Sequence, residues 1–357
     1  MKINTLSNHF QSDHFDGRHF HNPDGSCCQK ASEWLRWMLT EPKAQWPPQV
    51  PNLIKPQIFD RAPGHKPLVT FVLHACFLIQ WHGLNILIDP IYSRRCSPVP
   101  FCGPARVREP AVEFDKLPPI DFVLISHNHY DHLDGNTVRR LEAAHAPQFI
   151  CGLGDRSLLK KFGAKQITEL DWWQSAPLFG ALKVTFTQAQ HWSGRGWFDH
   201  MKSLWGGFFI ENSDCRIYFA GDTGYGPHFR TIRERLGIPD LSLLPVGAYK
   251  PRWFMREHHM DPEDAVHAHL DLQSRLSVGM HFGSFQLSNE GLDAPREDLA
   301  RARTLMGIPE NKFRIIEFGQ TITVEPVRMP MVKTADTPAI KPTVKIDRET
   351  QPIYQSL

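Results

Sequence analysis

The six residues HNHYDH, which begin at His127, bring three imidazoles and one carboxylate together. Neutral imidazole nitrogens and carboxylate oxygens are standard protein ligands of zinc and similar divalent ions. His127 and His129 lie two residues apart, so on an extended segment they point to the same side and can share one ion. Asp131 and His132 lie past the turn and can bind a second ion. The segment therefore predicts a two-metal site rather than a loop that is rich in histidine by chance.

Four neighbouring ligands cannot complete two metal sites, so further ligands must come from other parts of the chain. His191, Asp222 and His281 each follow an apolar, strand-like run, and a strand is a rigid element that can place a ligand. Alone, His191 would be an ordinary core or surface histidine, and Asp222 a turn residue in a glycine-flanked stretch. They become candidates because the HNHYDH segment needs partners. We expect two divalent ions, with zinc as the first choice, although iron and manganese accept the same N and O ligands.

The elements that must position these ligands can be predicted from hydrophobic periodicity and from turn residues. Predicted strands cover 69–74, 77–81, 85–89, 121–126, 182–188, 205–210, 215–220, 241–246, 276–281 and 313–318. Predicted helices cover 31–39, 136–144, 228–236, 262–270 and 295–305. Strands and helices that mix in two successive halves of a chain indicate a layered α/β protein.

The chain divides into three predicted parts. Residues 1–55 contain a polar arm, a short amphipathic helix and a Pro-rich connector that suits neither a helix nor a central strand. Residues 56–327 form the folded domain that carries the metal motif. Residues 328–357 are rich in Pro, Thr and Lys, which is typical of a flexible tail. The arm also holds four histidines whose irregular spacing offers no metal geometry, so we expect them to be disordered: His9, His14, His19 and His21.

The composition excludes several classes of protein. The net charge of +2 is far from the strongly basic balance of a dedicated nucleic-acid binder. The seven cysteines include no C-x-x-C pair, which argues against a disulfide framework and fits a reducing compartment. The polar N-terminus lacks the apolar centre of a signal peptide, and no apolar run of about 18 residues could span a membrane. We therefore expect a cytoplasmic protein with at most peripheral membrane contact.

The order of the ligands resembles that of the metallo-β-lactamase superfamily. The pattern H-x-H-x-D-H, a single His, an Asp in a G-D-T-G turn and a final His covers roughly residues 68–320. The resemblance implies a four-layer αβ/βα sandwich (an α/β or α+β fold) with the metals at one edge of the two sheets. It also implies the roles of the ligands. His127, His129 and His191 would hold the first ion, Asp131, His132 and His281 the second, and Asp222 would bridge them.

Further segments are similar to the family of phospholipases D that hydrolyse N-acylphosphatidylethanolamine, in a bacterial form. The similar segments are DFVLISHNHYDHLD (121–134), LDWW (170–173), FAGDTGY (219–225), GAYKPRWFM (247–255), HMDPEDAV (259–266) and HFGSFQLSNE (281–290). This resemblance makes 56–327 the catalytic domain. It implies cleavage of a phosphodiester bond into phosphatidic acid and an N-acylethanolamine, with Asp131 and Asp222 in the catalytic machinery. Two metal ions suit this reaction because they acidify a shared water and neutralise phosphoryl charge.

Residues near the predicted site could contact such a substrate. His259 matches the family's extra histidine in H-x-D-P-E and is a candidate for substrate contact or proton transfer. The alternative is that 259–264 only begins a helix, which explains the acidic residues and the proline but not His259. Lys250 and Arg252 could pair with phosphate, or be ordinary solvated charges, and the family's animal members suggest Glu at position 250. The candidates for an apolar acyl groove are Trp253, Phe254 and Met255, with Trp172 or Trp173.

Two alternatives to this function remain open from the sequence. Another hydrolase of the same fold, such as a lactonase, thioesterase or nuclease, would use the same metals. A non-catalytic metal-binding protein is disfavoured because all seven ligand positions hold competent residue types. The expected partners are a phospholipid and a membrane surface, on which the helix 31–39 could rest, rather than nucleic acid. The sequence leaves open whether the protein forms a homodimer.

Overall fold

Two seven-stranded mixed sheets make up the body of the computed structural model, which describes residues 13–26, 31–196 and 198–325. In the first sheet the strand order is β14 (Thr321–Thr323), β1 (Leu68–Leu73), β2 (Cys76–Trp81), β3 (Leu84–Ile88), β4 (Phe122–Ile125), β5 (Gln148–Gly152) and β6 (Gln166–Leu170). In the second the order is β13 (Phe313–Arg314), β12 (Leu276–Met280), β11 (Leu241–Pro245), β10 (Arg216–Phe219), β9 (Gly207–Glu211), β8 (Leu182–Thr187) and β7 (Ser175–Phe179).

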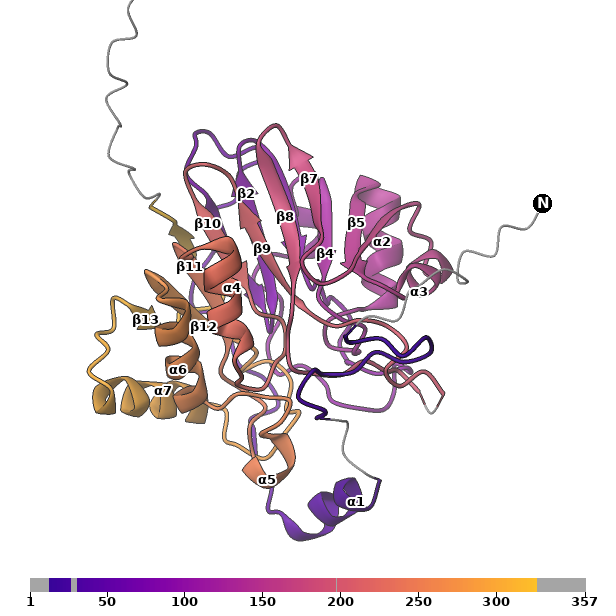
Figure 1. Cartoon of the computed structure of the whole chain (residues 1–357), viewed down its shortest axis with the longest axis vertical. Helices are drawn as coiled ribbons and strands as arrows, with labels where there is room; N and C mark the ends of the chain where they lie inside the picture. Colours follow the sequence, from indigo (N-terminus) through magenta and orange to yellow (C-terminus); the bar gives the residue numbers. More distant parts are fainter. Residues whose placement is uncertain (1–12, 27–30, 197, 326–357) are drawn as a thin grey trace, which may run out of the picture. The chain divides into compact units, whose positions relative to one another are not determined.

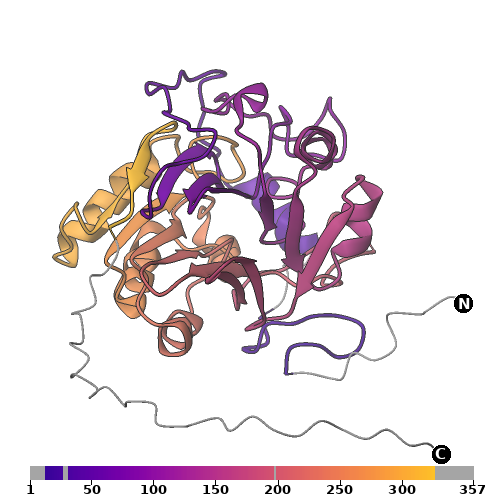
Figure 2. The same cartoon turned by 90° about the horizontal axis from the view of Figure 1, so that it is seen from above.

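Helices cover the outer faces of the two sheets (Figures 1 and 2). Beside the first sheet lie α2 (Gly135–His145) and α3 (Arg156–Lys161). Beside the second lie α4 (His228–Leu236), α6 (Pro262–Leu272) and α7 (Ala294–Leu305), while α1 (Ala31–Thr40) and α5 (Arg252–Met255) are neighbours away from the sheets. A 3-10 turn spans Phe114–Lys116. This order of helix, sheet, sheet and helix confirms the predicted sandwich class.

The central strands are apolar throughout because both of their faces are covered. All residues of β2, β4 and β11 are buried. The pairs β3–β4, β4–β5, β10–β11 and β11–β12 are parallel, and parallel strands are found almost only where helices shield both faces of the sheet. The core lies between the sheets. One consequence is that the loops after β4, β8, β10 and β12 are carried by rigid, buried strands.

Every predicted helix and strand is present in the structure, with small differences at its ends. Strand β13, however, covers only Phe313–Arg314 of the predicted 313–318. Seven short elements were not predicted: the 3-10 turn Phe114–Lys116, β5, α3, β6, β7, α5 and β14. The described residues all belong to one unit, Met1–Val327, and the predicted tail 328–357 lies outside them. Within the described part of the chain, no helix is both long and apolar enough to cross a membrane.

The expectation that the N-terminal arm and its histidines are disordered is wrong for the part of the arm that the structure describes. Residues 13–26 form a short N-terminal strap in which Phe15 pairs with Phe20 as an antiparallel bridge. Phe20 and Asn22 are buried, and the N–H of Phe20 donates to the carbonyl of Met201 over 2.7 Å. His14, expected to be disordered, is buried and its ring stacks on Trp172 at 4.4 Å. His9 lies outside the described residues.

Candidate metal centre

The predicted ligands meet at one edge of the two sheets. The HNHYDH segment runs from the end of β4 to the start of α2, and His191, Asp222 and His281 follow β8, β10 and β12. Backbone geometry helps to place Asp222, since Gly221 before it has φ +65°, and a Cβ there would lie 2.5 Å from the Gly206 carbonyl oxygen. Glycine tolerates such a conformation and approach. The structure therefore brings all seven predicted ligands together, and all but the partly buried His129 are buried.

Three imidazole nitrogens converge in one half of the site. His127 Nε2 lies 2.9 Å from His129 Nδ1, and His129 Nδ1 lies 3.2 Å from His191 Nε2. Ligands around a tetrahedral zinc ion with bonds of about 2.0–2.1 Å are separated by about 3.3 Å. These three nitrogens are close to that spacing and could hold one ion.

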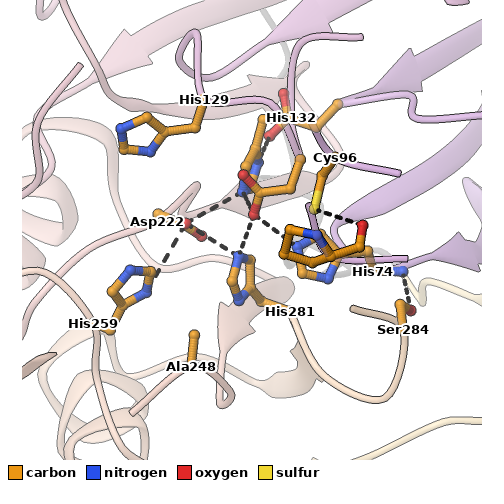
Figure 3. Close-up of polar contacts among 12 residues, drawn as sticks. His74, Cys96, His129, His132, Asp222, Ala248, His259, His281 and Ser284 are labelled. Atoms are coloured by element: carbon orange, nitrogen blue, oxygen red, sulfur yellow. Dashed lines mark hydrogen bonds and ion pairs between the residues drawn. The ribbon is translucent and has the colours of Figure 1, made fainter. Parts of the chain in front are cut away.

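The second half of the site combines carboxylates with imidazoles (Figure 3). Asp131 Oδ2 lies 3.4 Å from His132 Nε2 and 3.2 Å from His281 Nε2. Asp222 Oδ2 lies 3.2 Å from His132 Nε2 and 3.1 Å from His281 Nε2, and 3.9 Å from the Nε2 atoms of both His127 and His191. Asp222 thus stands between the two halves, where a bridging carboxylate would be. Its Oδ1 atom is buried without a hydrogen-bond partner in the described residues, so the donor set fits metal ions.

Groups behind the ligands orient the imidazole rings. His132 Nδ1 lies 2.7 Å from Asp89 Oδ2, and His191 Nδ1 lies 2.9 Å from the carbonyl oxygen of His258. His127 Nδ1 is 2.9 Å from Ser126 Oγ. Such partners hold the proton on Nδ1, which leaves Nε2 of each ring free to bind a metal. Neither Asp89 nor the carbonyl of His258 was predicted, and both residues are buried.

The electrostatics of the site also favour cations. Burial lowers the pKa of His127 and His191 well below the usual value, and the neighbouring imidazoles lower it further, so both rings are neutral. Burial opposes the charged form of His132, but the carboxylates of Asp222 and Asp131 outweigh it and raise the pKa well above normal. Burial likewise disfavours ionised Asp222, yet His132 and His281 hold its pKa well below normal. Ionised carboxylates beside protonated imidazoles can exchange those protons for a metal ion.

His74, at the end of β1, is a further residue of the site that was not predicted. Its Nε2 lies 3.0 Å from Asp131 Oδ2. Its backbone is left-handed, with φ 54°, and is held by Ser284 Oγ at 3.0 Å and by the N–H of His281 at 3.0 Å. Burial and the neighbouring His281 lower its pKa to about 4, so the neutral ring can donate Nε2–H to Asp131. Only its position at the end of a buried strand could have indicated this role from sequence.

A cavity of about 470 Å³ opens over the candidate metal centre. Its polar lining includes His129, Asp131, Asp222 and His259. Its other walls are largely apolar, and they include Cys96, Tyr130, Trp192, Ala248, Met255 and Leu287. The volume is in the usual range for small-molecule sites, and the mixture of an apolar wall with a few polar groups is typical of them.

Two of the predicted substrate contacts, His259 and Met255, line this cavity. His259 Nδ1 lies 3.9 Å from Asp222 Oδ2, and burial lowers the pKa of His259 to about 3, so its ring is neutral. The helix-entry alternative is also present, since Asp261 Oδ1 accepts the N–H of Asp264. That cap does not involve the ring of His259, which remains available to a substrate.

The other predicted substrate contacts do not line this cavity. Arg252 pairs with Asp261 at 3.1 Å and with Asp264 at 2.6 Å, because both carboxylates belong to the start of α6. Lys250 is exposed beside the same helix. Trp253, which is 42% exposed, donates Nε1–H to Glu41, and Phe254 packs against Trp37. Of the other aromatic pair, Trp172 is buried and donates to the Trp205 carbonyl, while Trp173 is half-buried under Arg235.

Comparisons with known proteins agree with this geometry. Residues 84–282, more than half of the chain, match the Beta-lactamase superfamily domain. N-acyl-phosphatidylethanolamine-hydrolyzing phospholipase D 1 of Caenorhabditis elegans is 36% identical over 242 residues, which cover 64% of this chain and 68% of that protein. The mitochondrial N-acyl-phosphatidylethanolamine-hydrolyzing phospholipase D of Saccharomyces cerevisiae is 34% identical over 64% of this chain and 50% of its own length.

A solved structure shows the same fold. Igni18, a metallo hydrolase of the archaeon Ignicoccus hospitalis, superposes with a TM-score of 0.55 over 73% of this chain and 99% of that one, at 24% identity. This likeness bears on the fold alone, whereas the sequence relatives and the convergent His and Asp side chains bear on the chemistry. The chain belongs to the metallo-β-lactamase superfamily, within the family of the nematode phospholipase D, and is a metal-dependent hydrolase.

Proposed function

We propose that the protein hydrolyses N-acylphosphatidylethanolamine to phosphatidic acid and an N-acylethanolamine, as a dinuclear phosphodiesterase of the phospholipase D type. The observation that carries the proposal is the position of Asp222 between one group of three imidazoles and a second group that contains Asp131. The similarity to two phospholipases D that act on this lipid supports the choice of substrate.

The proposed ligands divide as the distances suggest. His127, His129 and His191 would hold one ion, Asp131, His132 and His281 the other, and Asp222 both; zinc suits such N and O donors. Bound ions would acidify a water molecule and neutralise charge on the phosphoryl oxygens.

His259 would move the proton in this reaction. Its ring is neutral, and its buried Nδ1 has no hydrogen-bond partner in the part of the chain that the structure describes. Nδ1 can therefore accept a proton at the cavity wall and return it to the departing ethanolamine oxygen, which is a poor leaving group without one. The Nε2–H of the same neutral ring could alternatively contact a phosphoryl oxygen.

The acyl chains of a phospholipid are larger than a cavity of about 470 Å³, so a lipid substrate would also contact the surface beside the cavity. Helix α5 supplies Met255 to the cavity wall and packs against α1. The outer side of α1 exposes four large apolar side chains: Trp34, Leu35, Met38 and Leu39. An amphipathic helix of this kind can bury its apolar side in the headgroup region of a bilayer. We infer peripheral binding to a membrane, on its cytoplasmic face, with α1 in contact with the lipid.

The test is product analysis with purified protein and N-acylphosphatidylethanolamine in detergent micelles, beside an Asp131→Asn variant. The amide keeps the size of the side chain but weakens a ligand, so we expect phosphatidic acid and N-acylethanolamine from the wild type only. Absence of turnover by protein shown to contain two metal ions would refute the lipid substrate. Lactones, thioesters and nucleotides would then be assayed, since those substrates distinguish the alternative hydrolases.

A further inference from the structure

The N-terminal strap, residues 13–26, reaches the candidate metal centre through the side chain of Asn22. The strap is fixed at its start by His14, whose Nε2 lies 2.8 Å from Asp171 Oδ1, and in its middle by Phe20. Asn22 then turns inward and is 1% exposed. A polar side chain buried to this degree must find its hydrogen-bond partners inside the protein.

Asn22 finds them on the backbone of His191, 169 residues later in the chain. Its Nδ2 donates to the His191 carbonyl oxygen over 2.8 Å, and its Oδ1 accepts the His191 N–H over 3.2 Å. The second Nδ2 hydrogen is donated to the carbonyl of Ser26, and Oδ1 also accepts Nε1–H of Trp205. The carboxamide therefore uses both of its donors and its acceptor.

The Asn22 carboxamide forms the two backbone hydrogen bonds that a neighbouring strand would form within a sheet. His191 lies four residues beyond the end of β8, where the sheet no longer satisfies its backbone, and the residue is fully buried. A buried backbone N–H and C=O need partners, and the described residues supply both through Asn22. The imidazole is held separately, through Nδ1 and the carbonyl of His258. His191 Nε2 thus reaches the group of three imidazoles from a residue that is fixed at its backbone and at its ring.

We propose that Asn22 is a positioning residue for the first metal ion, and that the docked strap is part of the metal site. The inference rests on the proposed function only in taking His191 as a ligand. Without the carboxamide, two buried backbone groups at His191 lose their partners and the segment must shift to recover them. Partners behind a metal ligand typically contribute 10–100-fold to metal affinity. Because His191 belongs to one group of ligands, the loss should fall on one ion.

The test measures Zn²⁺ binding to the metal-free full-length chain, by competition with a chelating dye, together with its thermal unfolding. Asn22→Ala should bind one ion as the wild type does and the other 10–100-fold more weakly. Asn22→Asp keeps the acceptor for the His191 N–H but turns a carboxylate oxygen toward the His191 carbonyl, and should also show a loss at the same ion. Arg18→Ala, an exposed strap residue, is the matched control and should bind both ions normally.

The outcomes separate this inference from the proposed function. A wild type that binds no Zn²⁺ would overturn the metal centre itself, and this inference with it. A wild type that binds two ions, beside an Asn22→Ala variant with unchanged affinities or with an equal loss at both ions, would overturn only the role of Asn22. If Asn22→Ala does not fold, Asn22→Asp decides: normal affinity for both ions would overturn the role, and a selective loss would support it.

Discussion

A buried carboxylate behind the metal motif should make the stability of the protein depend on pH. Asp155 precedes α3 and is 1% exposed. Burial raises its pKa from 3.8 to about 7, although hydrogen bonds with Ser203 and Asn128 oppose the shift. Its Oδ2 atom has no hydrogen-bond partner in the described residues. We therefore expect Asp155 to be protonated in the folded state at pH 5 and largely ionised at pH 8.

The sign and size of the effect follow from linkage. Because the pKa of Asp155 is higher in the folded state, the folded protein binds more protons than the unfolded chain between about pH 4 and pH 7. The free energy of unfolding must then fall as the pH rises through that interval. A difference of about 3 pKa units corresponds to about 4 kcal/mol in total, of which about 2–3 kcal/mol lies between pH 5 and pH 8.

Asp155→Asn removes this titration. Other groups titrate over the same range, so the informative quantity is the difference in unfolding free energy between variant and wild type, from urea titrations of metal-free protein. We expect this difference to shift in favour of the variant by about 2–3 kcal/mol from pH 5 to pH 8. Asp115→Asn, whose side chain is 91% exposed, should show no such shift. A constant difference for Asp155→Asn would refute the reasoning, because the carboxylate would then not titrate near neutral pH.

Three further predictions concern the metal centre and its surroundings. His74→Phe should weaken binding of one ion about 10–100-fold in a Zn²⁺ titration. His74→Gln keeps a donor for Asp131 and should lose less affinity, so equal losses would argue against the hydrogen bond. His259→Ala should lower kcat about 100- to 10,000-fold with two ions still bound, measured by product formation and metal analysis, and an unchanged kcat would exclude proton transfer by this ring. Trp34→Ser with Leu39→Ser should reduce co-sedimentation with phospholipid vesicles while thermal unfolding stays the same, and undiminished binding would exclude α1 as the contact.

The ligands themselves could be predicted because their chemistry is concentrated in the sequence. His127, His129, Asp131 and His132 are close neighbours, and the remote ligands each follow an apolar run that forms a buried strand. A buried strand fixes the position of the residue that follows it, so a ligand's place after a strand in the sequence indicates where it lies in the fold. The same reasoning predicted the inner strands of both sheets except β5, a short buried strand between β4 and β6. It missed β6 and β7 at the sheet edges, where QITEL and SAPLF are short and partly exposed and one contains proline.

The residues that support the ligands could not be predicted in the same way. His132 pairs with Asp89, 43 positions earlier in the chain, and each is a single polar residue with no local pattern around it. Arg252 also has partners that were not predicted. Its residue type suggested phosphate, but Asp261 and Asp264 at the start of α6 are its partners, and the capping role of Asp261 was visible in the sequence. These two carboxylates are close to Arg252 in the sequence, so ion pairs with them could have been expected from the sequence.

These contacts imply that residues near the start of the chain help to position the ligands of the candidate metal centre. Asn22 fixes the backbone of His191, and His74 contacts Asp131, so each half of the centre depends on a residue that precedes the HNHYDH segment. A metal ion binds the folded arrangement of ligands and so stabilises whatever holds them. Metal binding should therefore protect the strap as well as the ligand loops from local opening. Hydrogen exchange at the amide of Phe20, which donates to Met201, should be slower in Zn²⁺-loaded protein than in metal-free protein. Equal exchange rates would show that the strap docks independently of the metal.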